Sequence, residues 1–207
     1  YTGNNLPLKV IQMYEHKLSQ EPNNISLYKI LAENYGWVQN LKKAIYYYEK
    51  LVEKAPNNLE FKKLLAKHYG WDNQIDKEIR QYEEIIKFLP NDIMYRLTLA
   101  KRYSWTNQGQ KEIKQYEKLV QLRPKNIYYR MKLAESYTGN ERLKEAISQY
   151  LTVVAMAPED LEARRLLARA LDWNNQPAEA VKHYQFLYDK DPSNLELLDK
   201  LAEGYLA

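Results

Sequence analysis

The sequence predicts an all-α array of stacked helical hairpins, because three features recur at one fixed interval along the chain. Prolines stand 34 residues apart, at Pro22, Pro56, Pro90, Pro124, Pro158 and Pro192. A Leu-Ala pair recurs at the same interval, at Leu31-Ala32, Leu65-Ala66, Leu99-Ala100, Leu133-Ala134, Leu167-Ala168 and Leu201-Ala202. So does a tyrosine, at Tyr14, Tyr48, Tyr82, Tyr116, Tyr150 and Tyr184. A fixed period over the whole chain is typical of a repeat array.

The first helix of each unit is expected to begin shortly after the proline. The residue two positions beyond each proline can cap a helix by accepting a hydrogen bond from a free N–H group of the first turn. These residues are Asn24, Asn58, Asp92, Asn126, Asp160 and Asn194. Apolar residues then recur at helical spacing, as in Leu27, Leu31 and Tyr35.

A second helix is expected after a short polar turn, such as Gln39-Asn40 or Asn73-Gln74. It should begin near Leu41, Ile75, Leu143 and Pro177, include the repeated tyrosine and end at the next proline. Each hairpin of this kind has one apolar side that it cannot bury alone. Neighbouring hairpins must therefore stack.

Composition excludes several classes of protein. The 207 residues are 45% hydrophobic, and 31 basic and 27 acidic residues leave a net charge of +4, which disfavours a nucleic-acid partner. The absence of cysteine excludes disulfides and thiol catalysis. No apolar stretch approaches the roughly 20 residues of a membrane span. Because the chain starts at Tyr1 without a signal-peptide pattern, we expect a piece of a longer protein.

These features together resemble the tetratricopeptide repeat family over essentially all 207 residues. The resemblance rests on the 34-residue period, the Leu-Ala-x-x-Tyr string, the second-helix tyrosine, the closing proline and the small residues Ala44, Ala146 and Ala180. It implies a right-handed α-solenoid of antiparallel hairpins, as one array over residues 1–207. The implied units are a partial repeat 1–24, full repeats 25–58, 59–92, 93–126, 127–160 and 161–194, and a partial repeat 195–207. The pentatricopeptide RNA readers, whose unit is slightly longer, fit poorly.

The chain departs from the family pattern at two positions of the repeat. Glu78 and Glu112 replace the small residue of the second helix, and we expect them to be partly exposed or hydrogen-bonded, because an unpaired buried carboxylate is costly. The turn glycine is replaced by Gln39, Asn73, Asn107, Glu141 and Asn175. The three asparagines can adopt the left-handed conformation of such a turn.

The resemblance further implies that the face of each first helix opposite its Leu, Ala and Tyr lines a concave groove for ligands. All four tryptophans share one position beside this face, Trp37, Trp71, Trp105 and Trp173, and Gly3 and Gly139 take that position in other units. The row is either an aromatic ladder for sugar rings or peptide side chains, or packing between adjacent first helices. Packing is the favoured interpretation, because large aromatic side chains usually bury their area. The gap at Gly139 would then leave a notch that could admit a ligand.

Basic residues on the same face are the second group of candidates: Lys29, Lys63, Lys67, Lys101, Arg165 and Arg169. They could bind an acidic peptide, a carboxyl terminus or an anionic polymer. A merely solvated face is the equal alternative, because four carboxylates share it, at Glu33, Glu60, Glu135 and Glu162. The two-carboxylate clamp of chaperone-binding family members is not recognisable.

No pattern for catalysis is found. His16, His68 and His183 lie in different repeats and helical phases, so they predict no metal cluster, and His68 and His183 are expected at the surface or at a seam between repeats. No phosphate-binding loop or nucleophile motif occurs. We therefore expect a protein without enzymatic activity, cofactor or metal. Its expected function is a scaffold that binds a partner protein or peptide in the groove.

A finer hypothesis comes from the ends of the first helices. The Tyr-Gly-Trp and Tyr-Ser-Trp strings are similar to repeats in exopolysaccharide-export scaffolds of the cellulose, poly-N-acetylglucosamine and Pel systems. This implies a periplasmic scaffold that recruits a polysaccharide-modifying enzyme or guides the polymer. The alternatives are direct polysaccharide binding by the tryptophan row, a structural spacer or self-assembling array, and nucleic-acid binding. A cytoplasmic location is the alternative to the periplasm.

Overall fold

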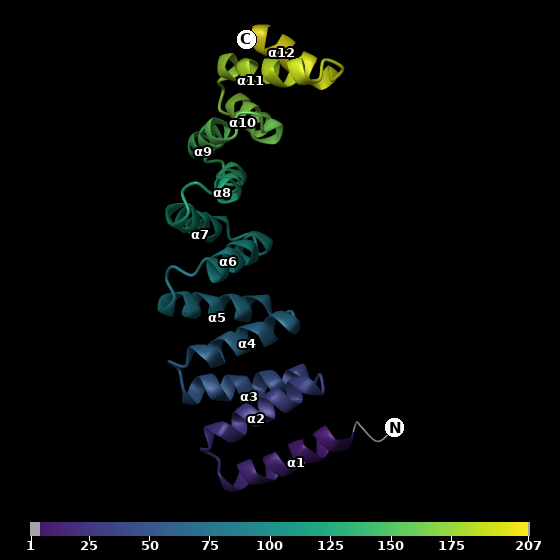
Figure 1. Cartoon of the computed structure of the whole chain (residues 1–207), viewed down its shortest axis with the longest axis vertical. Coiled ribbons are helices and arrows are strands. Elements are labelled where there is room, and N and C mark those ends of the chain that lie inside the picture. The colour runs from purple at the N-terminus through teal and green to yellow at the C-terminus, as the bar shows by residue number, and fades with distance from the viewer. Residues whose placement is uncertain (1–4, 207) are drawn as a thin grey trace. The chain divides into compact units, whose positions relative to one another are not determined.

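The computed structural model describes residues 5–206, and these form twelve α-helices without a β-strand (Figure 1). The all-α class predicted from the sequence is confirmed, with hairpins stacked as in an α-solenoid. The first helices of the hairpins are α2 (Ile25–Trp37), α4 (Leu59–Trp71), α6 (Ile93–Trp105), α8 (Ile127–Gly139), α10 (Leu161–Trp173) and α12 (Leu195–Leu206). The second helices are α1 (Asn5–Gln20), α3 (Leu41–Lys54), α5 (Ile75–Phe88), α7 (Gly109–Leu122), α9 (Leu143–Met156) and α11 (Pro177–Lys190).

The helix starts follow from local capping, as the sequence predicts. All six predicted caps accept a backbone N–H hydrogen bond with their side-chain oxygen, at 3.0–3.3 Å. The residues are Asn24, Asn58, Asp92, Asn126, Asp160 and Asn194. Because each cap lies two residues after a proline, the cap and the proline together set where one hairpin ends and the next begins.

The turns inside the hairpins use the left-handed backbone region. Gln39, Asn73, Asn107, Glu141 and Asn175 all have φ between 55° and 59°. The expectation for the three asparagines is confirmed. Gln39 and Glu141 adopt the same conformation, although a long side chain gains nothing from it, so the hairpin geometry imposes this backbone on whichever residue occupies the position.

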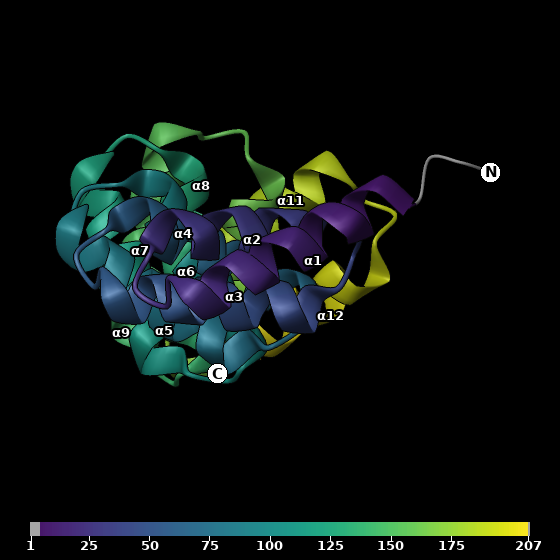
Figure 2. The same cartoon turned by 90° about the horizontal axis from the view of Figure 1, so that it is seen from below.

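The chain divides into two compact units, unit 1 (residues 1–95) and unit 2 (residues 96–207). In unit 1, contacts join α1 to α2, α2 to α3, α3 to α4 and α4 to α5. Viewed along the stack, α2 and α4 form one layer of this unit and α3 and α5 the other (Figure 2). Its core contains Leu31, Ala32, Ala44, Leu51 and Leu65, none more than 2% exposed.

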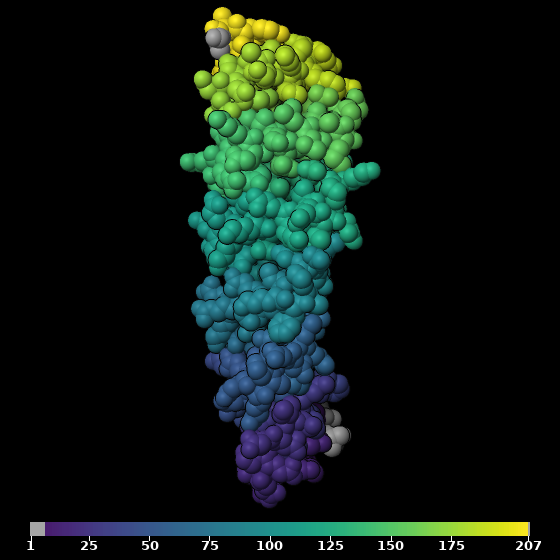
Figure 3. All heavy atoms as spheres, turned by 90° about the vertical axis from the view of Figure 1, so that its left-hand side faces the viewer, coloured from purple at the N-terminus to yellow at the C-terminus, as the bar shows by residue number. Residues whose placement is uncertain are grey.

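In unit 2, contacts join α7 to α8 and continue in chain order through α9, α10 and α11 to α12. The core again uses the repeated positions, with Leu133, Ala134, Ala146, Tyr150 and Leu167 buried. In the space-filling view the atoms of consecutive segments within each unit form a continuous surface (Figure 3). The apolar side of each hairpin is thus buried against the neighbouring hairpins. The outer positions of the helices remain available for contacts with other molecules.

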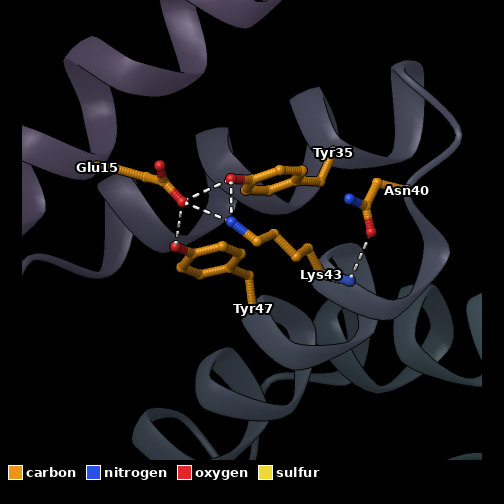
Figure 4. A network of polar contacts seen from close by, with 5 residues as sticks. All are labelled: Glu15, Tyr35, Asn40, Lys43 and Tyr47. Atoms are coloured by element: carbon orange, nitrogen blue, oxygen red, sulfur yellow. Dashed lines mark hydrogen bonds and ion pairs between the residues drawn. The ribbon is translucent and has the colours of Figure 1, made fainter.

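Hydrogen bonds from tyrosine to glutamate join neighbouring hairpins. The Tyr35 hydroxyl of α2 donates to Glu15 Oε1 of α1 at 2.5 Å, and Lys43 Nζ of α3 lies 3.2 Å from the same oxygen and 2.8 Å from the Tyr35 hydroxyl (Figure 4). The Tyr47 hydroxyl also donates to Glu15, at 3.3 Å, and its ring stacks on that of Tyr35. One carboxylate therefore holds three side chains from two helices.

The same arrangement recurs at intervals of the repeat. Tyr69 donates to Glu49 at 2.6 Å with Lys77 3.4 Å from that carboxylate. Tyr137 donates to Glu117 at 2.7 Å. We call these the Tyr–Glu pairs: Tyr35–Glu15, Tyr69–Glu49 and Tyr137–Glu117. In the next repeat leucines take both positions, at Leu151 and Leu171.

The two glutamates that replace the small second-helix residue differ in environment. Glu112 is half-buried, and its Oε1 lies 2.8 Å from the Ser136 hydroxyl, so the expectation is confirmed there. Glu78 is buried, at 2% exposed, so of the two alternatives expected for it partial exposure is wrong, and the residue is not without a partner. Its carboxylate lies against Gly70, where a Cβ would approach Glu78 Oε1 to 2.9 Å. A glycine in α4 therefore makes the room that a small residue in α5 would otherwise provide.

The buried tyrosines predict alkaline unfolding. Burial, followed by nearby carboxylate charge, raises the pKa of Tyr47 to about 12, and burial with the Glu117 hydrogen bond raises the pKa of Tyr137 to about 12. A raised folded-state pKa favours the neutral phenol in the fold. Its contribution to stability is complete below the ordinary pKa of 10.0 and is lost as pH rises from there towards about 12. Helix content, followed by circular dichroism, should fall in this window together with the appearance of tyrosinate absorbance.

The Y137F variant is the control, because it removes one titrating phenol without removing the ring. It should lose less stability than the parent chain across this pH window, measured relative to its own value at neutral pH. The difference in tyrosinate absorbance between the parent chain and Y137F isolates Tyr137; if that difference develops near pH 10 while the chain is still fully helical, the prediction is contradicted.

Candidate functional site

The four tryptophans near the ends of the first helices are exposed. Their exposed fractions are 85% for Trp37, 56% for Trp71, 69% for Trp105 and 57% for Trp173. The favoured expectation that they pack between first helices is therefore wrong. The helical phase of a residue predicts the face of its own helix on which the side chain lies. It does not predict whether a neighbouring helix covers that face. Gly3, the other glycine at this position, lies outside the described residues.

Three of these tryptophans have a cation over the indole ring from one turn earlier in the same helix. Lys67 Nζ lies 4.6 Å from the ring of Trp71, the Arg102 guanidinium 4.7 Å from Trp105, and the Arg169 guanidinium 5.2 Å from Trp173. Such cation–π contacts stabilise an exposed pair by about 0.5–1 kcal/mol. They fix both side chains as a joint cationic and aromatic surface.

In unit 1, an imidazole supports one of these rings. His68 of α4 is buried at 5% exposed, and its ring lies 4.5 Å from that of Tyr48 in α3 and 4.8 Å from that of Trp71. Its Nδ1 lies 2.7 Å from the Leu64 carbonyl oxygen. His68 thus occupies a seam, as one of the two sequence-based expectations held, and burial lowers its pKa.

The other basic candidates of unit 1 already have partners. Lys29 Nζ lies 3.3 Å from Glu60 and 4.0 Å from Glu33, and Lys63 Nζ lies 5.4 Å from the ring centre of Tyr95. These contacts fit the solvated-face alternative for Lys29. In unit 2, Lys101 of α6 is exposed.

A cavity of about 530 Å³ in unit 2 brings three of the candidates together. Arg165, Arg169 and Trp173 of α10 line it with Lys200 of α12. The remaining lining residues are Asp172, Tyr184, Asn194, Glu196 and Leu197. We call this the α10–α12 cavity. The sequence did not indicate Lys200, because this residue lies outside the groove-lining face predicted for each first helix. It lines the cavity because α12 packs beside α11.

The charges in the α10–α12 cavity are unequally compensated. Arg165 forms an ion pair with Glu162 at 2.8 Å, and Lys200 forms one with Glu203 at 2.7 Å. Asp172 accepts a hydrogen bond from Tyr184 at 2.7 Å, and burial together with this carboxylate raises the pKa of Tyr184.

Arg169 is the exception. In the part of the chain that the structure describes it forms no ion pair, and its guanidinium lies over Trp173. The cavity therefore presents one cation that is held in place by an aromatic ring and has no carboxylate of its own.

A second pocket, of about 410 Å³, lies in unit 2 where the tryptophan row is interrupted. It is lined by Ser104, Asn107, Gly109, Glu112, Glu135, Ser136, Gly139 and Asn140. We call it the Gly139 pocket. The notch that the sequence indicated at Gly139 is thus present, but its polar lining could not be foreseen from the position of one glycine.

Among residues 5–206, no group of three His, Cys, Asp or Glu side chains is arranged to hold a metal ion. Over the same residues, no helix has the length and apolar character needed to cross a membrane.

Comparison with known proteins supports the fold. No protein-family model and no curated protein matches the chain. Among solved structures, MamA is similar at 18% identity and a TM-score of 0.58, over 83% of this chain and 94% of that chain. YrrB, described as a TPR protein with an unusual peptide-binding site, is similar at 14% identity and 0.59, over 90% and 96%. A MamA fragment from Desulfovibrio magneticus RS-1 is similar at 16% and 0.54, over 82% and 96%. The chain therefore has a TPR-like fold.

The seam at His68 predicts a loss of stability in mild acid. Because burial lowers the folded-state pKa of His68 below 6.5, its contribution to stability is complete above pH 6.5 and is lost as pH falls below that value. An NMR titration of the His68 ring should therefore show a midpoint below 6.5.

The H68F variant keeps an aromatic ring between Tyr48 and Trp71 but cannot be protonated. Its thermal midpoint should fall less than that of the parent chain when the pH is lowered below 6.5. Burial also lowers the pKa of His183, so part of the acid sensitivity should remain in H68F. A His68 midpoint at or above 6.5 is incompatible with this account.

Proposed function

We propose that this chain is a scaffold that binds an acidic segment of a partner protein on the outer faces of its first helices. The observation that carries the proposal is the α10–α12 cavity, which places Arg165, Arg169 and Lys200 around the exposed ring of Trp173. Arg165 and Lys200 have carboxylate partners, so the uncompensated charge of Arg169 is what favours a ligand of negative charge.

The arrangement suits a peptide carboxylate for two reasons. Arginine offers a planar fork of N–H donors that can bind both oxygens of a carboxylate. Trp173 already orients the guanidinium of Arg169, so little side-chain freedom is lost when a carboxylate binds. The open face of the indole can then pack against an apolar residue next to the acidic one.

The scaffold itself needs no ordering on binding. The lining residues come from helices α10, α11 and α12, which pack on one another through buried Leu167, Leu171, Leu187 and Leu197. A peptide-binding site in YrrB, which has a similar fold, is consistent with this kind of function.

A second candidate function is direct binding of polysaccharide by the tryptophan row, which the exposure of all four indoles favours. The periplasmic exopolysaccharide-export role stays a prediction that rests on the Tyr-Gly-Trp and Tyr-Ser-Trp strings. Titration with oligosaccharides, including oligomers of N-acetylglucosamine, should change tryptophan fluorescence if the row binds sugar. A self-assembling array, the remaining alternative, would show light scattering that rises with protein concentration.

Selection from a random peptide library displayed on phage tests the proposed function. The chain should enrich peptides rich in aspartate and glutamate. The R165E/R169E variant should bind the selected peptides at least about tenfold more weakly, because hydrogen bonds to charged groups each contribute about 1.5–3 kcal/mol and a factor of ten needs about 1.4 kcal/mol.

The matched control is K144E/K182E, which makes the same change in net charge at two exposed lysines of unit 2 that do not line the cavity. It should keep binding the peptides. Enrichment of basic or uncharged peptides, or equal loss in the control, would count against the proposal.

A further inference from the structure

The Gly139 pocket is lined at two positions by glycine where other repeats carry larger side chains. Gly139 stands where four other repeats have tryptophan. Gly109, the first residue of α7, stands where the other second helices begin with Leu41, Ile75, Leu143 or Pro177. Both glycines line the same pocket, from different helices of unit 2.

The two glycines have different roles. A Cβ on Gly109 would lie 2.1 Å from Asn140 Oδ1, so any larger residue would displace the Asn140 amide. That amide is fixed by its Nδ2, which donates to the Ser136 carbonyl oxygen at 2.8 Å. A Cβ on Gly139, in contrast, would meet no atom within 4 Å. Gly109 thus makes room for a polar group in the wall, and Gly139 leaves the pocket open.

The charge pattern of unit 2 changes at the same repeat. One turn before Trp105 and Trp173 stand Lys101 and Arg169, whereas in unit 1 this position is Glu33 before Trp37 and Lys67 before Trp71. One turn before Gly139 stands a carboxylate, Glu135. This repeat therefore lacks both the aromatic ring and the cation that accompanies it, and it has a negative charge in their place.

The lining contains two carboxylates and no cation. Glu135 is partly neutralised by Lys132, whose Nζ lies 2.5 Å from Glu135 Oε2. Glu112 accepts from the Ser136 hydroxyl, at 2.8 Å, and forms no ion pair in the part of the chain that the structure describes. Ser136 is 6% exposed, so this hydroxyl is itself a buried part of the pocket.

We infer that the Gly139 pocket binds the basic side chain of a lysine or arginine in the partner segment. The ammonium or guanidinium group would pair with Glu112, and the oxygens of Ser104 and Asn140 can accept its remaining N–H groups. The inference rests on the proposed function, because it assigns a second contact to the same partner. No aromatic ring lines the pocket, which favours a basic side chain over a sugar.

The test is an NMR titration of the full chain with a small probe, which needs no knowledge of the partner. N-acetyl-arginine methylamide should produce saturable shifts in the backbone amides of Ser136, Gly139 and Asn140. The citrulline counterpart has nearly the same shape without the charge and should bind at least about tenfold more weakly. N-acetylglucosamine should produce no saturable shift at these residues.

Three variants locate the binding. E112Q keeps an acceptor for Ser136 but removes the charge, and it should weaken the arginine probe about tenfold. G139W fills the pocket and should abolish the shifts. G139A is the matched control, because its methyl group enters open space, and it should bind the probe as the parent chain does.

Equal shifts with the citrulline probe, or unchanged binding in E112Q, would overturn the inference. So would binding of N-acetylglucosamine alone, which would make the pocket a sugar site. If G139W does not fold, as judged by its thermal melt, E112Q decides. Failure of this inference can be distinguished from failure of the proposed function. Neither Glu112 nor Gly139 lines the α10–α12 cavity, and that cavity is tested separately by the selection of acidic peptides.

Discussion

Every feature of this structure depends on one constraint, that a hairpin of two helices cannot bury its apolar side without a neighbour. The repeated Leu, Ala and Tyr positions meet this constraint, and within each unit most of them are buried, whereas Tyr14 and Tyr82 are half-buried and Ala202 in the last helix is exposed. The Tyr–Glu pairs add a polar join at the edge of the same interface, where a phenol can be buried only if its hydroxyl has an acceptor. Residues on the outer face of the first helices do not take part in burying the apolar side of the hairpin. The chemistry of these residues can therefore differ from one repeat to the next.

The sequence predicted what is decided locally. Helix starts follow from Asn or Asp beside a proline, and all six caps are formed because each needs only the three residues after it. The left-handed turns are equally local, yet Gln39 and Glu141 show that residue type alone does not reveal them. There the hairpin imposes the backbone, so the position in the repeat is a better guide than the residue.

What the sequence could not predict depends on the distance between helices. The tryptophans were expected to pack because they are large, but their indoles remain exposed. The environments of Glu78 and Glu112 diverge for a similar reason. Identical residues at the same position become buried or half-buried according to which side chains the neighbouring helices present, and Gly70 and Ser136 are not equivalent positions of the repeat.

The α10–α12 cavity and the Gly139 pocket show how a repeat array gains specificity without changing its fold. Arg169 with Trp173 and Glu135 with Gly139 occupy the same pair of positions in adjacent repeats. One pair offers a cation on an aromatic ring, and the other offers a carboxylate beside an open pocket. Because the Leu-Ala pair and the second-helix tyrosine are buried in both repeats, the outer positions can change sign while these core positions are kept. A segment with acidic and basic residues at a matching separation would satisfy both pockets, whereas a uniformly charged segment would be attracted by one and repelled by the other.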